Sequence, residues 1–419
     1  MKISNKNLYK YIYALLFLPL LARLFTDNFG LSYAIMPIFD IYAIALLLLT
    51  FYLSKKRNPY IELWALIFIF SAIISLVING GTSFSNFFYS ARPYFRMIIA
   101  IVLAASAFDI KRFEKLFKYV ETLLYVNVFV MTYQFIFQGL RQDVIGGTFG
   151  NNQGVNAIQN LLCVFVFCVT VEYYLRKFIS KKRLIINIIV IFYIAVLAEI
   201  NMIFFEVVII GGILFLLNKS RSQHISKRKL FLISDGLYGV GIGLYLFMKF
   251  NPDRLFLLSF FNILEYLGFN NGNTGVYRIS RIKVFSQLGN LFFKNDLCRW
   301  LFGYGLGNCS THSSFYNIYQ NLQYTFFSSS NIFLETGLVG AFANIGVIVT
   351  TLFLSIRNRS LTFDIKQKAW MDISIVISII MLLLFFYNTT LRDTYTAFFA
   401  GVSLGIPYVI KTQKRALNK

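Results

Sequence analysis

Long apolar stretches separated by short polar or basic ones run along most of the chain. A helix needs about 20 apolar residues to cross a bilayer, and twelve segments near this length can be drawn. Residues 199–201 interrupt the run shared by the seventh and eighth segments, so one kinked helix there would reduce the number to eleven. The expected spans are 8–26, 31–53, 61–79, 94–108, 119–138, 156–175, 184–199, 201–217, 229–249, 331–355, 371–389 and 394–410.

Basic residues gather on alternate connections between these segments, which the positive-inside rule assigns to the cytoplasm. Twelve spans keep this alternation and put both termini in the cytoplasm, whereas eleven would separate the termini. We therefore predict twelve spans. The basic clusters are Lys2/Lys6/Lys10, Lys55–Arg57, Lys111–Lys118, Arg176–Arg183, Lys219–Lys229, Arg357–Lys368 and Lys411–Lys419.

The composition agrees with an all-α integral membrane protein, because 57% of residues are hydrophobic and only 14% are charged. Soluble proteins carry about 25% charged residues. The net charge of +22 lies mostly in the cytoplasmic clusters, so it requires no nucleic-acid partner. The domain plan is a membrane part with nine spans (1–249), a long external loop with amphipathic helices (250–330) and a membrane part with three spans (331–419). The first apolar run continues as a full span, so no cleavable signal is expected.

Arginine outnumbers lysine on the predicted external side, the reverse of the cytoplasmic side. Its planar fork of donors matches the oxygens of a phosphate or diphosphate. Four of these arginines are expected to anchor in lipid headgroups instead, because arginine near a helix end can reach lipid phosphate. They are Arg23, Arg254, Arg299 and Arg392.

Arg278 and Arg281 differ from those four because an apolar pattern at helical spacing surrounds them. The pattern predicts an amphipathic helix over 276–293, in which the two arginines project from neighbouring turns and can converge on one anion. Anchoring on the membrane is the alternative. The apolar positions are Ile279, Ile282, Phe285, Leu288 and Phe292.

Two further groups are candidates for substrate binding. Arg141 precedes a glycine-rich segment ending in Asn151 and Asn152, whose amides suit sugar hydroxyls or helix capping. Arg92 and Arg96 lie four residues apart on one face at the expected start of the fourth span. Pro93 would fit the first turn of that helix.

Gly303–Gly307, with glycine at every second position, predicts a compact turn, since no strand–turn–helix context supports nucleotide binding. His312 is the one histidine of the predicted external side and a candidate general base, although a lone loop histidine is often incidental. Glu206 lies within a span, where it could pair with an arginine. The external acids are scattered, so neither a metal nor another cofactor is expected. Cys298 and Cys309 in the external loop could form a disulfide.

Together these features resemble the O-antigen polymerase and O-antigen ligase superfamily. The residues that carry the resemblance are few, but they occur in order along most of the chain. An Arg, ten residues and a Gly, as at Arg278 and Gly289, is a spacing described for the polymerases. The other segments are Gly147–Asn152 before the sixth span, Leu301–Gly307 in the long loop, and Glu335–Gly340 in the following span.

The resemblance implies inverting glycosyl transfer on the outer face of the bacterial plasma membrane, from an undecaprenyl-diphosphate-linked oligosaccharide. Membrane lipid and a chain-length regulator are further implied partners. Two positions depart from the family: Ser330–Asn331 stands where ligases carry His-Asn, and Glu199–Asn201 where many members carry Ser-Arg. A polymerase of O-antigen or capsule is therefore favoured, with a ligase as the nearer alternative and a lipid-linked sugar flippase as the more distant one. A flippase would place polar residues along a midplane path, whereas here they lie in the external loops.

Overall fold

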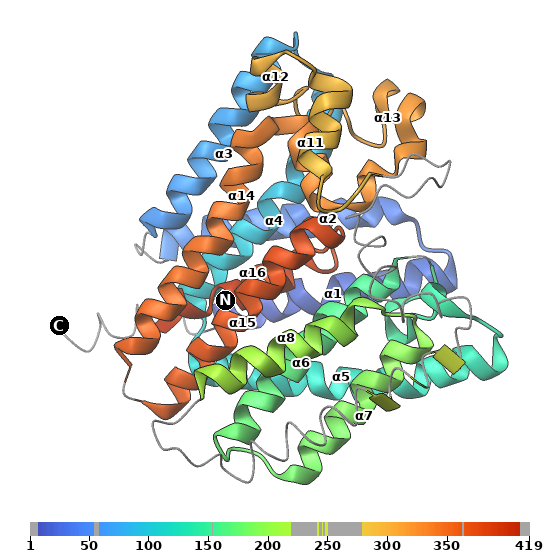
Figure 1. The fold of residues 1–419 in the computed structure, drawn as a ribbon, viewed down its shortest axis with the longest axis vertical. Helices are drawn as coiled ribbons and strands as arrows, with labels where there is room; N and C mark the ends of the chain where they lie inside the picture. The colour runs from blue at the N-terminus through green and yellow to red at the C-terminus, as the bar shows by residue number, and fades with distance from the viewer. Residues whose placement is uncertain are drawn as a thin grey trace.

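The computed structural model describes residues 7–53, 58–152, 154–218, 279–362 and 364–410, with a few helical positions between 241 and 249. In these ranges all regular elements are helical (Figure 1). Eight helices are long and apolar enough to cross a membrane, which makes the chain a multi-pass membrane protein. They are α1 (Leu8–Phe29), α2 (Met36–Leu53, extended at its start by the short 3₁₀ helix Tyr33–Ile35), α3 (Pro59–Ile78), α4 (Phe84–Ala107), α5 (Ile110–Phe137), α6 (Val155–Leu175), α14 (Ser328–Ser360) and α15 (Ile365–Tyr387).

Three shorter helices, α7 (Lys181–Leu197), α8 (Met202–Leu217) and α16 (Ala397–Leu404), coincide with further expected spans. The expected span 229–249 lies largely outside the described residues, so twelve spans remain a prediction. Between α7 and α8 the chain turns at Glu199, whose φ is +55°, and the two helices are separate rather than one kinked helix.

The helices α4 and α5 begin about nine residues before their expected starts. Ser83 accepts a hydrogen bond from the Asn86 N–H, and Asp109 accepts one from the Arg112 N–H at 2.8 Å. Such caps start a helix among polar residues, so a search for apolar segments alone misses the first turns. Most of the expected external loop 79–93 is therefore the first three turns of α4, and Pro93 lies inside the helix rather than in its first turn.

Close helix packing depends on small residues. A Cβ at Gly401 of α16 would lie 2.3 Å from the carbonyl oxygen of Met97 in α4, and one at Gly405 would lie 2.6 Å from the Cβ of Ala104. In membranes, helices gain contact mainly through such close approach. Similarly, α14 packs along both α3 and α15. The helices that carry the site are therefore packed against α4 or α14.

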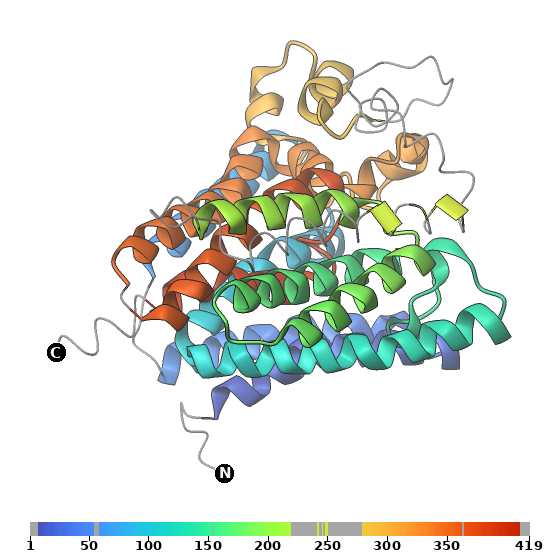
Figure 2. The ribbon, with the colours of Figure 1, turned by 60° about the horizontal axis from the view of Figure 1, so that its bottom comes forward.

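Residues 279–327 form a small layer on one end of these helices, hereafter the loop side (Figure 2). Aromatic rings form its core: Phe293 lies 5.1 Å from Phe333 of α14 and 5.3 Å from Tyr304, measured between ring centroids. Its short elements are α11 (Val284–Leu288), the π-helix Gly289–Phe293, α12 (Leu297–Phe302), α13 (Ser314–Tyr319) and the 3₁₀ turns Gln320–Leu322 and Tyr324–Phe326.

The amphipathic helix expected over 276–293 is shorter than predicted, since it starts at Val284. Before it, the Ser280 N–H donates to Gln287 Oε1 at 2.7 Å, and Ser280 Oγ accepts from the Lys283 N–H at 3.3 Å. These bonds close a turn before the helix. Ile282, expected on the apolar face, is exposed.

Candidate functional site

The glycine-rich segment after α12 is a compact turn, as predicted, and its glycines are required by close packing. Gly303, Gly305 and Gly307 have φ angles of +72°, +99° and +90°, which side-chain-bearing residues rarely adopt. A Cβ at Gly303 would lie 2.7 Å from the backbone nitrogen of Gly337 in α14. Gly337 itself has a φ of +64° and ψ of −164°, so α14 is kinked where the turn meets it.

The kink frees backbone carbonyls of α14 to hold the turn. The Tyr304 N–H donates to the Leu334 carbonyl at 2.7 Å, and the Gly305 N–H donates to the Glu335 carbonyl at 3.0 Å. From α3, Ser75 Oγ also donates to the Glu335 carbonyl, at 3.0 Å. The turn, α3 and α14 therefore form one hydrogen-bonded unit.

The side chain of Glu335 extends this unit to α4. Its carboxylate accepts hydrogen bonds from Tyr94 Oη at 2.7 Å, Ser90 Oγ at 3.2 Å and the Gly307 N–H at 3.1 Å. Glu335 is only 2% exposed. Three neutral donors thus satisfy a buried carboxylate that, among the described residues, forms no ion pair.

Arg92 and Arg96 lie on one face of α4, as expected, but both are bound by Asp40 of α2. Arg96 forms a fork, with Nε 2.6 Å and Nη2 2.8 Å from the two Asp40 oxygens, and Arg92 Nη1 is 3.1 Å from Asp40 Oδ2. Asp40 and Arg96 are buried. The donors expected to bind substrate are largely occupied by a carboxylate of the protein. The sequence analysis missed Asp40, although a lone acid inside an expected span is itself a signal of a specific partner.

Arg96 also fixes the connection between α15 and α16, because its Nη1 donates to the Arg392 carbonyl at 2.6 Å. The guanidinium of Arg392 lies 5.6 Å from the ring centroid of Tyr94. Its Nη1 is buried without a hydrogen-bond partner, and within the described ranges the guanidinium makes no ion pair. Burial raises the pKa of the neighbouring Asp393 carboxyl, while Arg23, Arg96 and Arg392 lower it. Arg392, which the sequence suggested as a headgroup anchor, is thus half-buried against Tyr94.

His312 lies beside this group. Its exposed ring is 4.3 Å from the ring of Tyr89 between centroids, and the Arg92 guanidinium lies 5.0 Å from the same Tyr89 ring. The structure therefore brings two of the predicted site residues, Arg92 and His312, onto one tyrosine of α4.

Arg281 lies in the bend before α11 rather than on a helix. Its guanidinium lies 4.5 Å from the ring centroid of Tyr387 at the end of α15, and 5.4 Å from that of Phe327 before α14. Arg278 lies outside the described residues, so their convergence on one anion remains a prediction. The position of Arg281 is nevertheless on the loop side, against the ends of α14 and α15.

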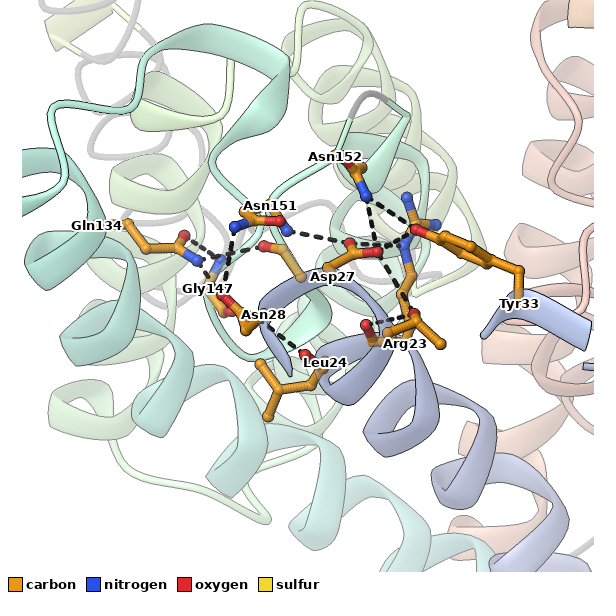
Figure 3. A network of polar contacts seen from close by, with 11 residues as sticks. Arg23, Leu24, Asp27, Asn28, Tyr33, Gln134, Gly147, Asn151 and Asn152 are labelled. Atoms are coloured by element: carbon orange, nitrogen blue, oxygen red, sulfur yellow. Dashed lines mark hydrogen bonds and ion pairs between the residues drawn. The ribbon is translucent and has the colours of Figure 1, made fainter. Parts of the chain in front are cut away.

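Asn151 and Asn152 belong to a second network, which joins the segment before α6 to the end of α1 (Figure 3). The Asn151 N–H and Asn152 Nδ2 donate to the Asp27 carboxylate at 3.1 and 2.8 Å, and Asn152 Nδ2 also donates to Tyr33 Oη at 2.8 Å. The alternative that Asn152 caps α6 is not what the structure shows, since Gly154 occupies the N-cap without a side-chain bond. Both asparagines already use their donors within the protein.

The glycines of this segment allow the same kind of close packing. Gly147 has a φ of +60°, and a Cβ there would lie 2.2 Å from Asn127 Oδ1. A Cβ at Gly150 would lie 2.1 Å from Asp27 Oδ2, and Gln134 Oε1 accepts from the Gly147 N–H at 2.6 Å. Segment 146–152 is therefore docked between α1 and α5.

Arg141 is exposed just beyond the end of α5, where it donates to the carbonyls of Phe135 and Leu140 at 2.8 and 2.9 Å. These contacts hold it on its own helix end rather than in the group around Arg392. Glu206 is buried and accepts from Asn160 Nδ2 at 3.2 Å, not from an arginine as suggested. Cys298 and Cys309 are both free, the first exposed and the second buried.

The departures from the superfamily pattern also have local roles. Asn331 Nδ2 donates to the Phe327 carbonyl at 2.9 Å, and Ser330 Oγ donates to the same oxygen at 3.0 Å, so this pair closes the turn before α14.

No protein-family model matches the chain, and a search of curated proteins finds no relative. Function must therefore be argued from the site: a set of arginines, a histidine and tyrosines around the kinked start of α14.

Proposed function

We propose that the protein is a polymerase of cell-surface polysaccharide, either O-antigen or capsule. It would join undecaprenyl-diphosphate-linked oligosaccharide units on the outer face of the bacterial plasma membrane, with both termini cytoplasmic. The observation that carries the proposal is the gathering of Arg92, Arg281, His312 and Arg392 on the loop side of a multi-pass membrane protein. Guanidinium groups in such a setting suit a diphosphate leaving group attached to a membrane-held chain.

In the proposed reaction, a hydroxyl oxygen of the acceptor unit attacks the anomeric carbon of the donor sugar. The bond from that carbon to the phosphate oxygen breaks, and the electron pair leaves with undecaprenyl diphosphate. Arg278 and Arg281 are the arginines proposed to stabilise the leaving charge, and His312 is the proposed acceptor of the hydroxyl proton. Arg141, held at the end of α5, is not kept in this role. Membrane anchoring of both substrates supplies much of the rate through proximity.

The contacts of Asp40 change the proposed role of Arg92 and Arg96. Because Arg96 is buried and bound at all three of its nitrogens, we assign it to positioning the α15–α16 connection. Arg92 is less buried, with 20% of its side chain exposed, and lies over the same tyrosine as His312. We therefore keep Arg92, but not Arg96, among the residues proposed to contact substrate.

A flippase is less well supported, because two fully buried acids away from the loop side, Glu172 and Asp372, form ion pairs. Arg176 binds both Glu172 and Asp372, and Arg359 binds Asp372 as well. Such paired groups stabilise helix packing without an open polar path. A ligase is less well supported because Ser330 and Asn331 cap a turn and offer no imidazole.

The three functions block a glycan pathway at different intermediates, so a deletion strain separates them. We expect single repeat units that are still exported and transferred to their final acceptor. Long polymer on undecaprenyl diphosphate would indicate a ligase, and single units trapped on the cytoplasmic side would indicate a flippase. Glycans should be sized, and their lipid carrier and membrane side determined; either of the latter two patterns would reject the polymerase.

A further inference from the structure

The start of α14 and the α15–α16 connection contain buried side-chain donors that make no hydrogen bond to any residue the structure describes. They are Arg392 Nη1, Thr390 Oγ1 and Ser329 Oγ, and both hydroxyl-bearing residues are fully buried. Buried polar atoms are nearly always hydrogen-bonded, and an exception calls for an explanation such as an absent ligand. Three exceptions in one part of the fold indicate a common cause.

These residues are held close together by Asn388. Ser328, next to Ser329, donates to the Asn388 carbonyl through both its N–H and its Oγ, at 2.9 Å each. The Thr390 N–H donates to Asn388 Oδ1 at 2.9 Å. Ser329 and Thr390 therefore flank one residue, and Arg392 follows two positions later in the same turn.

The electrostatic setting favours an anion. Phe327 occupies the N-cap of α14 and offers no side-chain acceptor, so the helix start keeps its partial positive charge. Glu335 accepts hydrogen bonds from three neutral donors and forms no ion pair among the described residues. Tyr94 contacts both groups, since its hydroxyl bonds Glu335 and its ring carries the Arg392 guanidinium. Asp393 is the other adjacent acid, and burial raises the pKa of its carboxyl.

We infer that Arg392, Thr390 and Ser329 form an oxyanion site at the start of α14 that binds a phosphate group. Guanidinium and hydroxyl donors around a helix N-terminus match the acceptor oxygens of a phosphate ester. This inference rests on the proposed function for its natural ligand, the diphosphate of the donor lipid, but its chemistry stands independently. It adds Arg392, which forms no ion pair among the described residues, to the arginines proposed to bind the diphosphate, whereas Arg96 is bound by Asp40.

The test is binding of inorganic diphosphate to the full-length protein in phosphatidylcholine nanodiscs, measured by calorimetry. Arg392→Gln should weaken binding by about 10- to 100-fold and Thr390→Val by about 10-fold, because a hydrogen bond to a charged group is lost. Ser329→Ala should act in the same direction. The matched control is Arg299→Gln, which removes one positive charge from the exposed surface of the same layer, where Arg299 pairs with Asp296; its affinity should stay within about twofold of wild type.

A stability measurement separates a ligand site from a structural role. Because Arg392 has an unpaired buried nitrogen, Arg392→Gln should leave the melting temperature of the ligand-free protein unchanged or higher. A lowered melting temperature with unchanged diphosphate binding would overturn the inference, as would equal affinities for Arg392→Gln and Arg299→Gln. Loss of binding only in Arg392→Gln, Thr390→Val and Ser329→Ala would support it.

Repeating the binding measurement in a second lipid tests whether the phosphate comes from a lipid headgroup. If a lipid headgroup fills the site, phosphatidylglycerol discs should weaken diphosphate binding to wild type more than to Arg392→Gln; equal weakening would leave the donor diphosphate as the ligand. The deletion strain keeps the two proposals apart. Full-length polymer in that strain rejects the polymerase while the binding result stands, whereas single units together with unaltered binding by Arg392→Gln reject only the oxyanion site.

Discussion

Replacing Asp40 by asparagine should destabilise the protein more than any comparable loss of a surface ion pair. Asp40 is the carboxylate partner of both Arg96 and Arg92, at 2.6 and 3.1 Å, and only 5% of its side chain is exposed. Arg96, 7% exposed, would be left as a buried charge without a counter-charge. Removing one partner of a buried pair costs about 3 to 5 kcal/mol.

The same chain provides the control. Arg299 pairs with Asp296 at 3.3 Å, but 41% and 43% of their side chains are exposed. Asp296→Asn should therefore cost less than about 1 kcal/mol, because solvent screens the pair. A double variant, Asp40→Asn with Arg96→Gln, should recover part of the loss, since it removes the uncompensated charge as well.

Free energies of unfolding would be measured by titrating a denaturing detergent into the protein in mixed micelles, with folding followed by circular dichroism. The expected order of stability is wild type, Asp296→Asn, the double variant and then Asp40→Asn. An Asp40→Asn variant as stable as Asp296→Asn would refute the assignment of Asp40 as the counter-charge. A double variant less stable than Asp40→Asn would show that Arg96 contributes chiefly through Arg392 rather than through Asp40.

Three further predictions concern the loop side. Gly303→Ala should destabilise the protein by several kcal/mol, since its Cβ would lie 2.7 Å from backbone atoms of α14. The control is Gly154→Ala, which should cost only about 1 to 2 kcal/mol, because Gly154 has a φ of +84° but open space around it. Unfolding in denaturing detergent compares the two variants. Glu335→Gln should cost about 1 to 3 kcal/mol, because an amide nitrogen would face one of the donors Tyr94, Ser90 or Gly307; equal stability of the variant and wild type would contradict this. A membrane-impermeant maleimide applied to intact spheroplasts should label exposed Cys298 and spare Cys309, whose pKa is raised by burial; labelling only after lysis would place residues 279–327 on the cytoplasmic side and reject the predicted topology.

Apolar runs predicted the helices well because length and hydropathy are local properties. Each expected span that falls in the described residues coincides with a helix, but the starts at Phe84 and Ile110 were missed. Those turns are polar, and the caps that begin them, Ser83 and Asp109, are single residues outside the apolar window. The twelve-span topology also assigns each connection to one side of the membrane, and the positions of the helices alone do not give that assignment.

The candidate site was harder to predict because it depends on pairing. Arg92 and Arg96 were expected to bind substrate and Arg392 to anchor in headgroups, yet the first two face Asp40 and the third forms no ion pair among the described residues. Which arginine is satisfied follows from the packing of α2 against α4, contacts that lie about fifty residues apart in the chain. The composition of the predicted external side indicated anion binding, but only the contacts indicate which guanidinium has a donor left for an anion.

The glycine segments show why motif residues need not be the residues that do chemistry. Gly147 and Gly150 let the segment before α6 approach Asn127 and Asp27, and Gly303 lets the turn after α12 approach the kink at Gly337. In each case a backbone in a left-handed conformation meets a helix too closely for a Cβ. Such positions tolerate no side chain whatever the substrate is, so a shared pattern of glycines indicates shared docking geometry more strongly than a shared reaction.

The acid in the Glu335–Gly340 segment connects that docking geometry to the proposed anion site. Through its backbone Glu335 holds Gly305, and through its carboxylate it holds Gly307 and the Tyr94 hydroxyl. Tyr94 in turn supports the Arg392 guanidinium. The Glu335 carboxylate accepts from these neutral donors, and Arg392 Nη1 makes no hydrogen bond to any residue that the structure describes. The same contacts that fix the loop layer on the helices therefore also hold a positive charge at the start of α14.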